Sequence, residues 1–168
     1  MISIRLDDFK SNIGKFLRGN RFSISIDNTL FDEREFYTCK GSAIPGKTFG
    51  EVELCWQGYK YKILTDVQFN DITFHFYNTI DQNGIGIRDK FETWFNIISG
   101  EDNIQTPHDL YKSTVHISQL DNLGNTVKTY VLLYAHPKEI SEIELSMDSA
   151  DQVEEFTVTF SFTRFIIE

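Results

Sequence analysis

The stretch EFYTCKGSAIPGKTFGEVELCWQGYKYKI, residues 35–63, decides how this chain folds. Within it, apolar Val52, Leu54 and Trp56 alternate with the residues Glu51, Glu53 and Cys55. Strict alternation predicts a β-strand, here over residues 51–57, with one apolar face and one largely acidic face. Gly58 interrupts this pattern, and the alternation of aromatic residues with lysine then predicts a further short strand over residues 59–63.

A loop is predicted just before this strand. Residues 36–40 are expected to form a strand, and residues 41–50 are expected to connect it to the strand over 51–57. Pro45 has no donor N–H and Gly46 tolerates positive φ, so a hydrogen-bonded ladder is not expected to continue through them. Loops of this length often carry a function.

The rest of the chain repeats the two-faced strand pattern. Strands are predicted over residues 21–27, 71–78, 114–118, 127–134, 143–147 and 156–163, and residues 101–112 and 135–140 are expected to be connections. One helix is predicted over residues 87–99, with a stripe formed by Ile87, Phe91, Trp94, Phe95 and Ile98. Residues 1–20 are expected to form an N-terminal arm or short helix.

This pattern predicts a single domain over residues 1–168. It is mainly β, an antiparallel sandwich or barrel of about seven or eight strands with one packed helix.

The composition excludes several classes of protein. The net charge is −9, with 16 basic residues among 25 acidic ones, which argues against tight binding of nucleic acid. No apolar run approaches the roughly 20 residues that a membrane-spanning helix needs. The N-terminus, MISIRLDDFK, carries charges where a signal peptide is apolar. The two cysteines are therefore expected to be reduced thiols in a cytosol.

Two patterns imitate metal sites. The segment DQNGIGIRDKFE, residues 81–92, matches a calcium loop in part, but its fifth position is Ile85, and a turn leading into a helix is the simpler interpretation. Cys39, Cys55, His75 and His116 lack the close paired spacing of a zinc site. No metal or cofactor is expected.

Catalytic patterns are equally weak. Glu51 and Glu53 share one strand face, and Asp71 and His75 share another, but wet sheet faces commonly carry such pairs. The sequence contains no GxSxG, GxxxxGK or GxGxxG motif. The chain is not expected to be an enzyme.

The organising stretch also carries a family resemblance. An aromatic strand, CKGSAIPG, an acidic and apolar strand and WQGYKYKI, followed by FETWF and the closing strand, resemble the tail tube proteins of contractile-tailed bacteriophages. These proteins are similar to the tube protein of type VI secretion systems, and the resemblance covers most of the chain. It implies hexameric rings whose strands join into a closed inner barrel, stacked into a hollow tube through which DNA passes into the host.

The resemblance also implies partners and a location. The chain would form a homo-hexamer inside a tail sheath, with baseplate and tail-terminator proteins at the tube ends, in a virion tail assembled in the host cytoplasm. DNA would pass without specific binding, because six copies carry six times −9, or −54, formal charges.

Two sets of residues follow from this interpretation. The residues expected to line the lumen are Glu51, Glu53, Asp71, Thr73, His75, Thr114, His116 and Ser118. The contact between rings is expected from the loop over residues 41–50, through Ser42, Ala43, Ile44, Pro45, Gly46 and Lys47.

Two alternatives remain open. One is an adaptor that initiates or terminates a tube, or the tube of a related contractile injection system. The other is a monomeric β-sandwich that binds a ligand, which should show aromatic and basic residues together on one exposed face.

Overall fold

The computed structural model describes residues 17–81, 83–100, 106–147 and 152–168 of the chain. The described residues form nine strands, and seven of these make one antiparallel sheet in the order β1-β6-β7-β8-β5-β2, with β9 paired to β7. The bounds are β1 Phe22–Ile26, β2 Cys39–Gly41, β5 Ile72–Tyr77, β6 Ser113–Leu120, β7 Thr126–Ile140, β8 Glu155–Ser161 and β9 Arg164–Ile167. The other two strands, β3 Lys47–Trp56 and β4 Tyr59–Phe69, pair only with each other.

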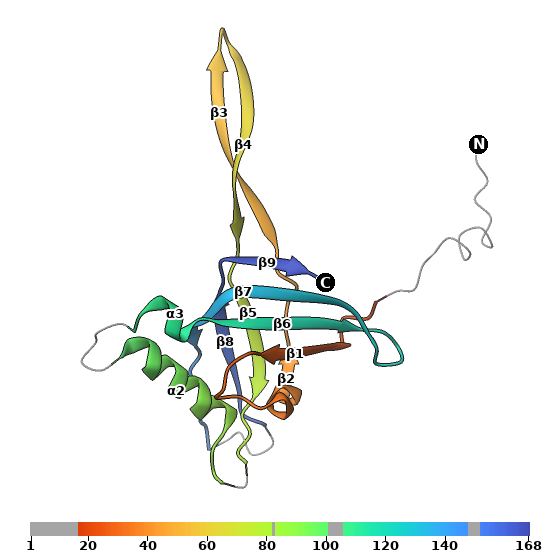
Figure 1. The fold of residues 1–168 in the computed structure, drawn as a ribbon, viewed down its shortest axis with the longest axis vertical. Helices are drawn as coiled ribbons and strands as arrows, with labels where there is room; N and C mark the ends of the chain where they lie inside the picture. The colour runs from red at the N-terminus through yellow and green to blue at the C-terminus, as the bar shows by residue number, and fades with distance from the viewer. Residues whose placement is uncertain (1–16, 82, 101–105, 148–151) are drawn as a thin grey trace, which may run out of the picture.

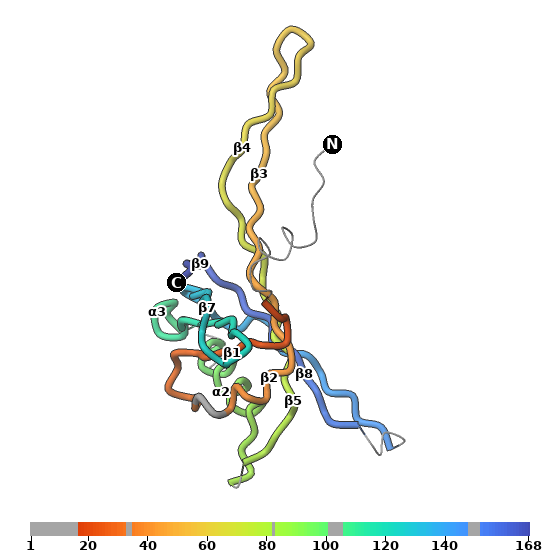
Figure 2. The backbone as a smooth tube through the Cα atoms, turned by 90° about the vertical axis from the view of Figure 1, so that its right-hand side faces the viewer, coloured from red at the N-terminus to blue at the C-terminus, as the bar shows by residue number. Residues whose placement is uncertain are grey.

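The seven-stranded sheet folds into two layers because its longest strand serves both. The first part of β7 pairs with β6 and β9, and from His136 onward it pairs with β8. Between these parts lies Tyr134, whose φ of 57° bends the strand. The layer of β1, β6, β7 and β9 lies across the layer of β2, β5 and β8 (Figures 1 and 2). The predicted antiparallel sandwich or barrel is therefore confirmed.

Aromatic side chains fill the space between the layers. Helix α2, Ile87–Ser99, coincides with the predicted helix and buries Ile87, Phe91 and Trp94. The Phe91 ring lies 5.4 Å from that of Phe76 on β5, and Trp94 lies 5.8 Å from Phe160 on β8. Trp94 Nε1 also donates to the Tyr111 carbonyl at 2.9 Å, which ties α2 to the short helix α3, His108–Tyr111.

Several predicted elements differ from the structure. Instead of a strand over 36–40, a 3₁₀ helix, η1 Glu33–Thr38, precedes the short β2. The Glu35 carboxylate accepts the Asp32 N–H at 3.1 Å, and the Thr38 hydroxyl donates to the Glu35 carbonyl at 2.6 Å, so local side-chain bonds favour the helix. Phe36 is buried at its centre, beside the ring of Phe31.

The other differences concern strand ends. The predicted loop over 41–50 is confined to residues 42–46, because β3 already begins at Lys47. The predicted connection over 135–140 is wrong: β7 continues there, and Pro137 is accommodated beside a register irregularity. The strand predicted over 143–147 is absent, while α3 and β9 were not predicted. The N-terminal arm lies mostly outside the described residues.

Candidate assembly surfaces

The β3–β4 hairpin, residues 47–69, projects from the body along the longest axis of the molecule (Figures 1 and 2). Its strands are joined by a two-residue turn in which Gln57 and Gly58 have φ values of 46° and 85°. Two successive positive φ angles are typical of a type I′ turn, whose twist matches that of the paired strands. The hairpin is longer than predicted because the pairing continues from Ile63 to Phe69.

The hairpin has one apolar face. Directly opposed residues of an antiparallel pair share a face, so the register places together Val52, Leu54, Trp56, Tyr59, Tyr61 and Ile63. These side chains are exposed, Trp56 at 74% and Tyr59 at 79%. None of them belongs to the hydrophobic core cluster of the described residues.

The other face of the hairpin is charged and internally paired. Lys62 lies 2.6 Å from Glu51, and Lys60 lies 2.9 Å from Glu53. These are exposed ion pairs, which typically contribute about 0–1 kcal/mol to stability. They also neutralise the two carboxylates that were expected to make the lumen acidic.

An isolated two-stranded hairpin is marginally stable in water. Here one whole face of large apolar side chains has no cover from the described body of the same chain. Exposed apolar surface of this kind marks a contact with another protein. The hairpin is therefore the strongest candidate for an assembly surface.

The predicted lumen residues lie at three separate places. Glu51 and Glu53 are on the hairpin, as described above. Asp71, Thr73 and His75 lie at the start of β5 and on its outward face, in the layer of β2, β5 and β8. Thr114, His116 and Ser118 lie on β6, in the other layer. The structure thus brings the members of each group together but keeps the three groups apart.

The β5 group is part of a polar network. The Thr73 and Thr159 hydroxyls are hydrogen-bonded at 3.1 Å, and Lys138 Nζ donates to the Asp71 carboxylate at 2.6 Å. Lys40 on β2 donates to both oxygens of Glu155 on β8. This outer face is therefore wet and carries hydroxyls and paired charges of both signs.

The β6 group is bonded to neighbouring strands in the same way. His116 Nε2 lies 3.0 Å from the Asp27 carboxylate, and the Ser118 and Thr129 hydroxyls lie 3.0 Å apart. The Thr114 carbonyl accepts the Asp27 N–H at 2.9 Å. The β5 group and the β6 group both face away from the core, but they lie in different layers of the sheet.

The predicted contact loop lies against its own subunit. With Asn70, Asp71, Ile72, Thr73 and His75, residues 41–46 line a cavity of about 530 Å³. Pro45 is buried, whereas Ala43 and Ile44 are exposed. Lys47 places its ammonium 4.6 Å from the centre of the Phe165 ring. The outermost part of the molecule is the hairpin that follows this loop.

The residues that imitated metal sites have structural partners. Asp81 accepts the N–H groups of Asn83 and Ile85 at 2.8 and 3.0 Å, and Asp89 accepts the Gly86 N–H at 2.7 Å. Burial raises the pKa of the Cys39 thiol to about 11, while Cys55 lies on the exposed hairpin. In the described part of the chain, no three His, Cys, Asp or Glu residues are grouped so as to hold a metal.

Sequence reasoning missed how far the hairpin projects. Its apolar side chains have the same alternation as the core strands, and alternation does not distinguish a face covered by the same subunit from one that awaits a partner. A usable signal was present, since the two-faced pattern continues across the Gln57–Gly58 turn far beyond an ordinary strand length.

Comparison with known proteins decides the family. The sequence profile of the phage tail tube proteins matches residues 8–168. The chain belongs to the phage tail tube protein family. Its role is accordingly structural rather than enzymatic, as a component of a virion tail. Among the described residues, no helix is long and apolar enough to cross a bilayer.

Individual relatives agree with this assignment. The tail tube protein gp19 of Enterobacteria phage T4 is 24% identical over 151 residues, covering 88% of this chain and 90% of the relative. A chain of the sheath–tube complex of an extracellular contractile injection system, PVC, in its extended state has the same fold, with a TM-score of 0.68, 15% identity and 99% of both chains covered. A chain of the tube-terminating cap of the anti-feeding prophage has a TM-score of 0.70 at 16% identity, with 93% of both chains covered.

Proposed function

We propose that copies of this tail tube protein join head to tail through the β3–β4 hairpin into stacked hexameric rings that form the hollow inner tube of a phage tail. The observation that carries this proposal is the uncovered apolar face of the hairpin. Burying this face against a second copy removes the surfaces of large aromatic side chains from water. This burial stabilises the contact by about 25 cal/mol for each Å² of apolar surface. The contact between rings, which the family resemblance led us to expect at residues 42–47, then extends along the whole hairpin.

The outer face of β5 and β8 is the part of the molecule best suited to line the channel. It carries Thr73, His75 and Thr159, and it lies on the side away from α2 (Figure 2). Hydroxyls and paired charges hold water well and offer no cluster of cations to a phosphate backbone. DNA would pass this wall without specific binding, while α2 and the β6 face would look outward, toward a sheath.

The first experiment is negative-stain electron microscopy of the purified chain. We expect rings or hollow tubes, and we expect Trp56→Ser to weaken assembly at least tenfold while leaving the folded monomer intact. The matched control is Leu123→Ser, which removes an equally exposed apolar side chain from the turn between β6 and β7. A chain that stays monomeric even with a baseplate present, or equal effects of the two substitutions, would contradict the proposal.

A tube-terminating or tube-initiating adaptor is the second candidate, because the anti-feeding prophage cap shares this fold. An adaptor would end or begin a tube built from another protein and would not polymerise alone. Long tubes formed by the purified chain distinguish the two. The family assignment argues against the other alternative, a monomeric ligand-binding module.

A further inference from the structure

The end of the molecule opposite the hairpin contains a cleft. The backbone ladder between β7 and β8 ends at Ser141, whose N–H donates to the Thr157 carbonyl and whose hydroxyl accepts the Thr157 N–H, both at 2.9 Å. Beyond this point the two chain segments diverge. Glu154 stays with β5, because its carbonyl accepts the Asn78 N–H at 2.8 Å. The segment that continues from β7 turns away from it.

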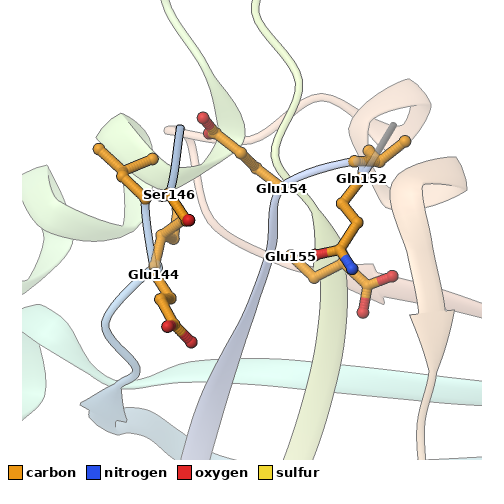
Figure 3. A pocket seen from close by; sticks show the side chains of 8 residues that line it. Glu144, Ser146, Gln152, Glu154 and Glu155 are labelled. Atoms are coloured by element: carbon orange, nitrogen blue, oxygen red, sulfur yellow. The ribbon is translucent and has the colours of Figure 1, made fainter. Parts of the chain in front are cut away.

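The space between these segments is about 540 Å³, and we call it the base cleft, bounded by residues 143–146 and 152–155. Figure 3 shows Glu144 and Ser146 on one wall and Gln152, Glu154 and Glu155 on the other. The first wall has the alternating sequence of a strand, yet it joins no ladder in the described chain. A strand-like segment that lies outside the ladders of the described residues suits pairing with another chain.

The lining of the base cleft combines apolar and acidic side chains. Leu145 and Val153 are exposed at 78% and 65%, and Met147 beside them is fully exposed. Glu155 is held by Lys40 and Glu154 by Asn78, whereas Glu144 is bonded to no other described residue. The base cleft therefore fits a partner that presents large apolar side chains with a cation beside them.

The hairpin has this chemistry at its tip. Trp56 and Tyr59 are its outermost apolar pair, and Lys60 and Lys62 follow on the charged face. Each of these two lysines takes part in an exposed ion pair, and such pairs exchange partners at little cost. The hairpin and the base cleft lie at opposite ends of the molecule (Figures 1 and 2). A contact between different surfaces on successive copies does not close on itself and can repeat indefinitely.

We propose that the base cleft of one copy receives the hairpin tip of the next, with Trp56 and Tyr59 against Leu145 and Val153, and with a lysine of the hairpin beside Glu144. This assignment rests on the proposed function and names the surface that receives the hairpin.

Carbodiimide cross-linking of the assembled, unmodified chain tests the contact, since it joins only carboxylates and amines that already touch. We expect isopeptide links from Lys60 or Lys62 to Glu144, shown to join different copies by mixing ¹⁵N-labelled and unlabelled protein. The Lys60–Glu53 pair within one hairpin is the internal control. Tubes that show the control link but join Glu144 to other lysines, or to none, would overturn the cleft assignment and leave the proposed function standing. Failure of the unmodified chain to assemble even with a baseplate present would overturn both.

Charge reversal gives a second, independent readout. We expect Glu144→Lys to raise the concentration needed for assembly at least tenfold, and Lys60→Glu in the same chain to restore much of the loss. Asp109→Lys makes the same reversal of charge at an exposed position of α3 and should have little effect. If Asp109→Lys and Glu144→Lys act equally, or if the second change restores nothing, the proposed contact is wrong.

Discussion

His136 lies on β7 just after the bend at Tyr134, and its Nδ1 atom is buried without a hydrogen-bond partner among the described residues. Burial lowers the pKa of this imidazole below its ordinary value of 6.5, and electrostatic interaction with the nearby Lys112 and His108 acts in the same direction. The Tyr134 backbone and Asp71 oppose these effects without overcoming them. His136 therefore binds a proton less readily in the folded chain than in the unfolded chain.

The sign of the resulting pH dependence follows from linkage. The stability that His136 contributes is fully present above pH 6.5 and is lost as the pH drops from there toward the lowered pKa, since in that range only the unfolded state gains the proton. We expect the urea midpoint to fall less between pH 7.5 and pH 5.5 in His136→Gln than in the unmodified chain. His75→Gln, which removes an exposed histidine, is the control. An unchanged acid loss in His136→Gln would contradict this account.

At the scale of elements, α2 closes the core against the layer of β5 and β8. The Phe91 ring lies 4.7 Å from that of Phe31, 5.4 Å from that of Phe76 and 6.1 Å from that of Phe160. Phe91 is fully buried, so its removal leaves a cavity among rings held by several strands.

We expect Phe91→Ala to lower the free energy of unfolding by about 3–5 kcal/mol, the usual cost of deleting a buried aromatic ring. The control is Asn96→Ala on the exposed side of the same helix, which should change stability by less than about 0.5 kcal/mol. Urea denaturation measures both. A loss below about 1 kcal/mol for Phe91→Ala would show that the helix is not part of the cooperative core.

Helices and strands that bury one apolar face in the core could be predicted from the sequence. The helix over 87–99 and the strands around Ile24, Phe74 and Val158 follow from apolar periodicity alone, because their apolar residues meet in one core. The 3₁₀ helix at Phe36 was missed because bonds of Glu35 and Thr38 outweigh an aromatic, strand-like composition. Periodicity places the candidate lumen residues on polar strand faces, but it does not reveal their division among the hairpin and two layers, which depends on the separate β3–β4 pairing and on the bend in β7.

The segment over 143–147 shows a different limit. Its alternation predicts a strand, but it pairs with no strand of the described residues. If the base cleft receives a second copy, the alternating pattern of residues 143–147 matches their structure in the assembled tube and not in the isolated chain. The hairpin is the counterpart of this segment, since its apolar face is covered by none of the described residues.

For the whole molecule, hairpin and base cleft make the two ends different, so a growing tube has a direction. Residues 48–68 can be removed without touching the core, because none of them belongs to the core cluster and Lys47 is already paired with Phe69 at the base of the hairpin. An Asn-Gly turn between these two residues would close the shortened chain. Such a copy keeps its base cleft but has no hairpin to offer.

We expect this truncated chain to fold with an unchanged core and to form no tubes alone. Mixed with about one part in ten into the full-length chain, it should still accept hairpins at one end and stop growth at the other, which follows from the heterologous contact. Mean tube length measured by electron microscopy should then fall steeply, whereas the same proportion of full-length Leu123→Ser should leave it unchanged. If the truncated copies were simply excluded and tubes kept their length, the body of the subunit would not recognise the hairpins of its neighbours. If they entered the tubes without shortening them, growth would not depend on the hairpin, and the head-to-tail contact would have to lie elsewhere.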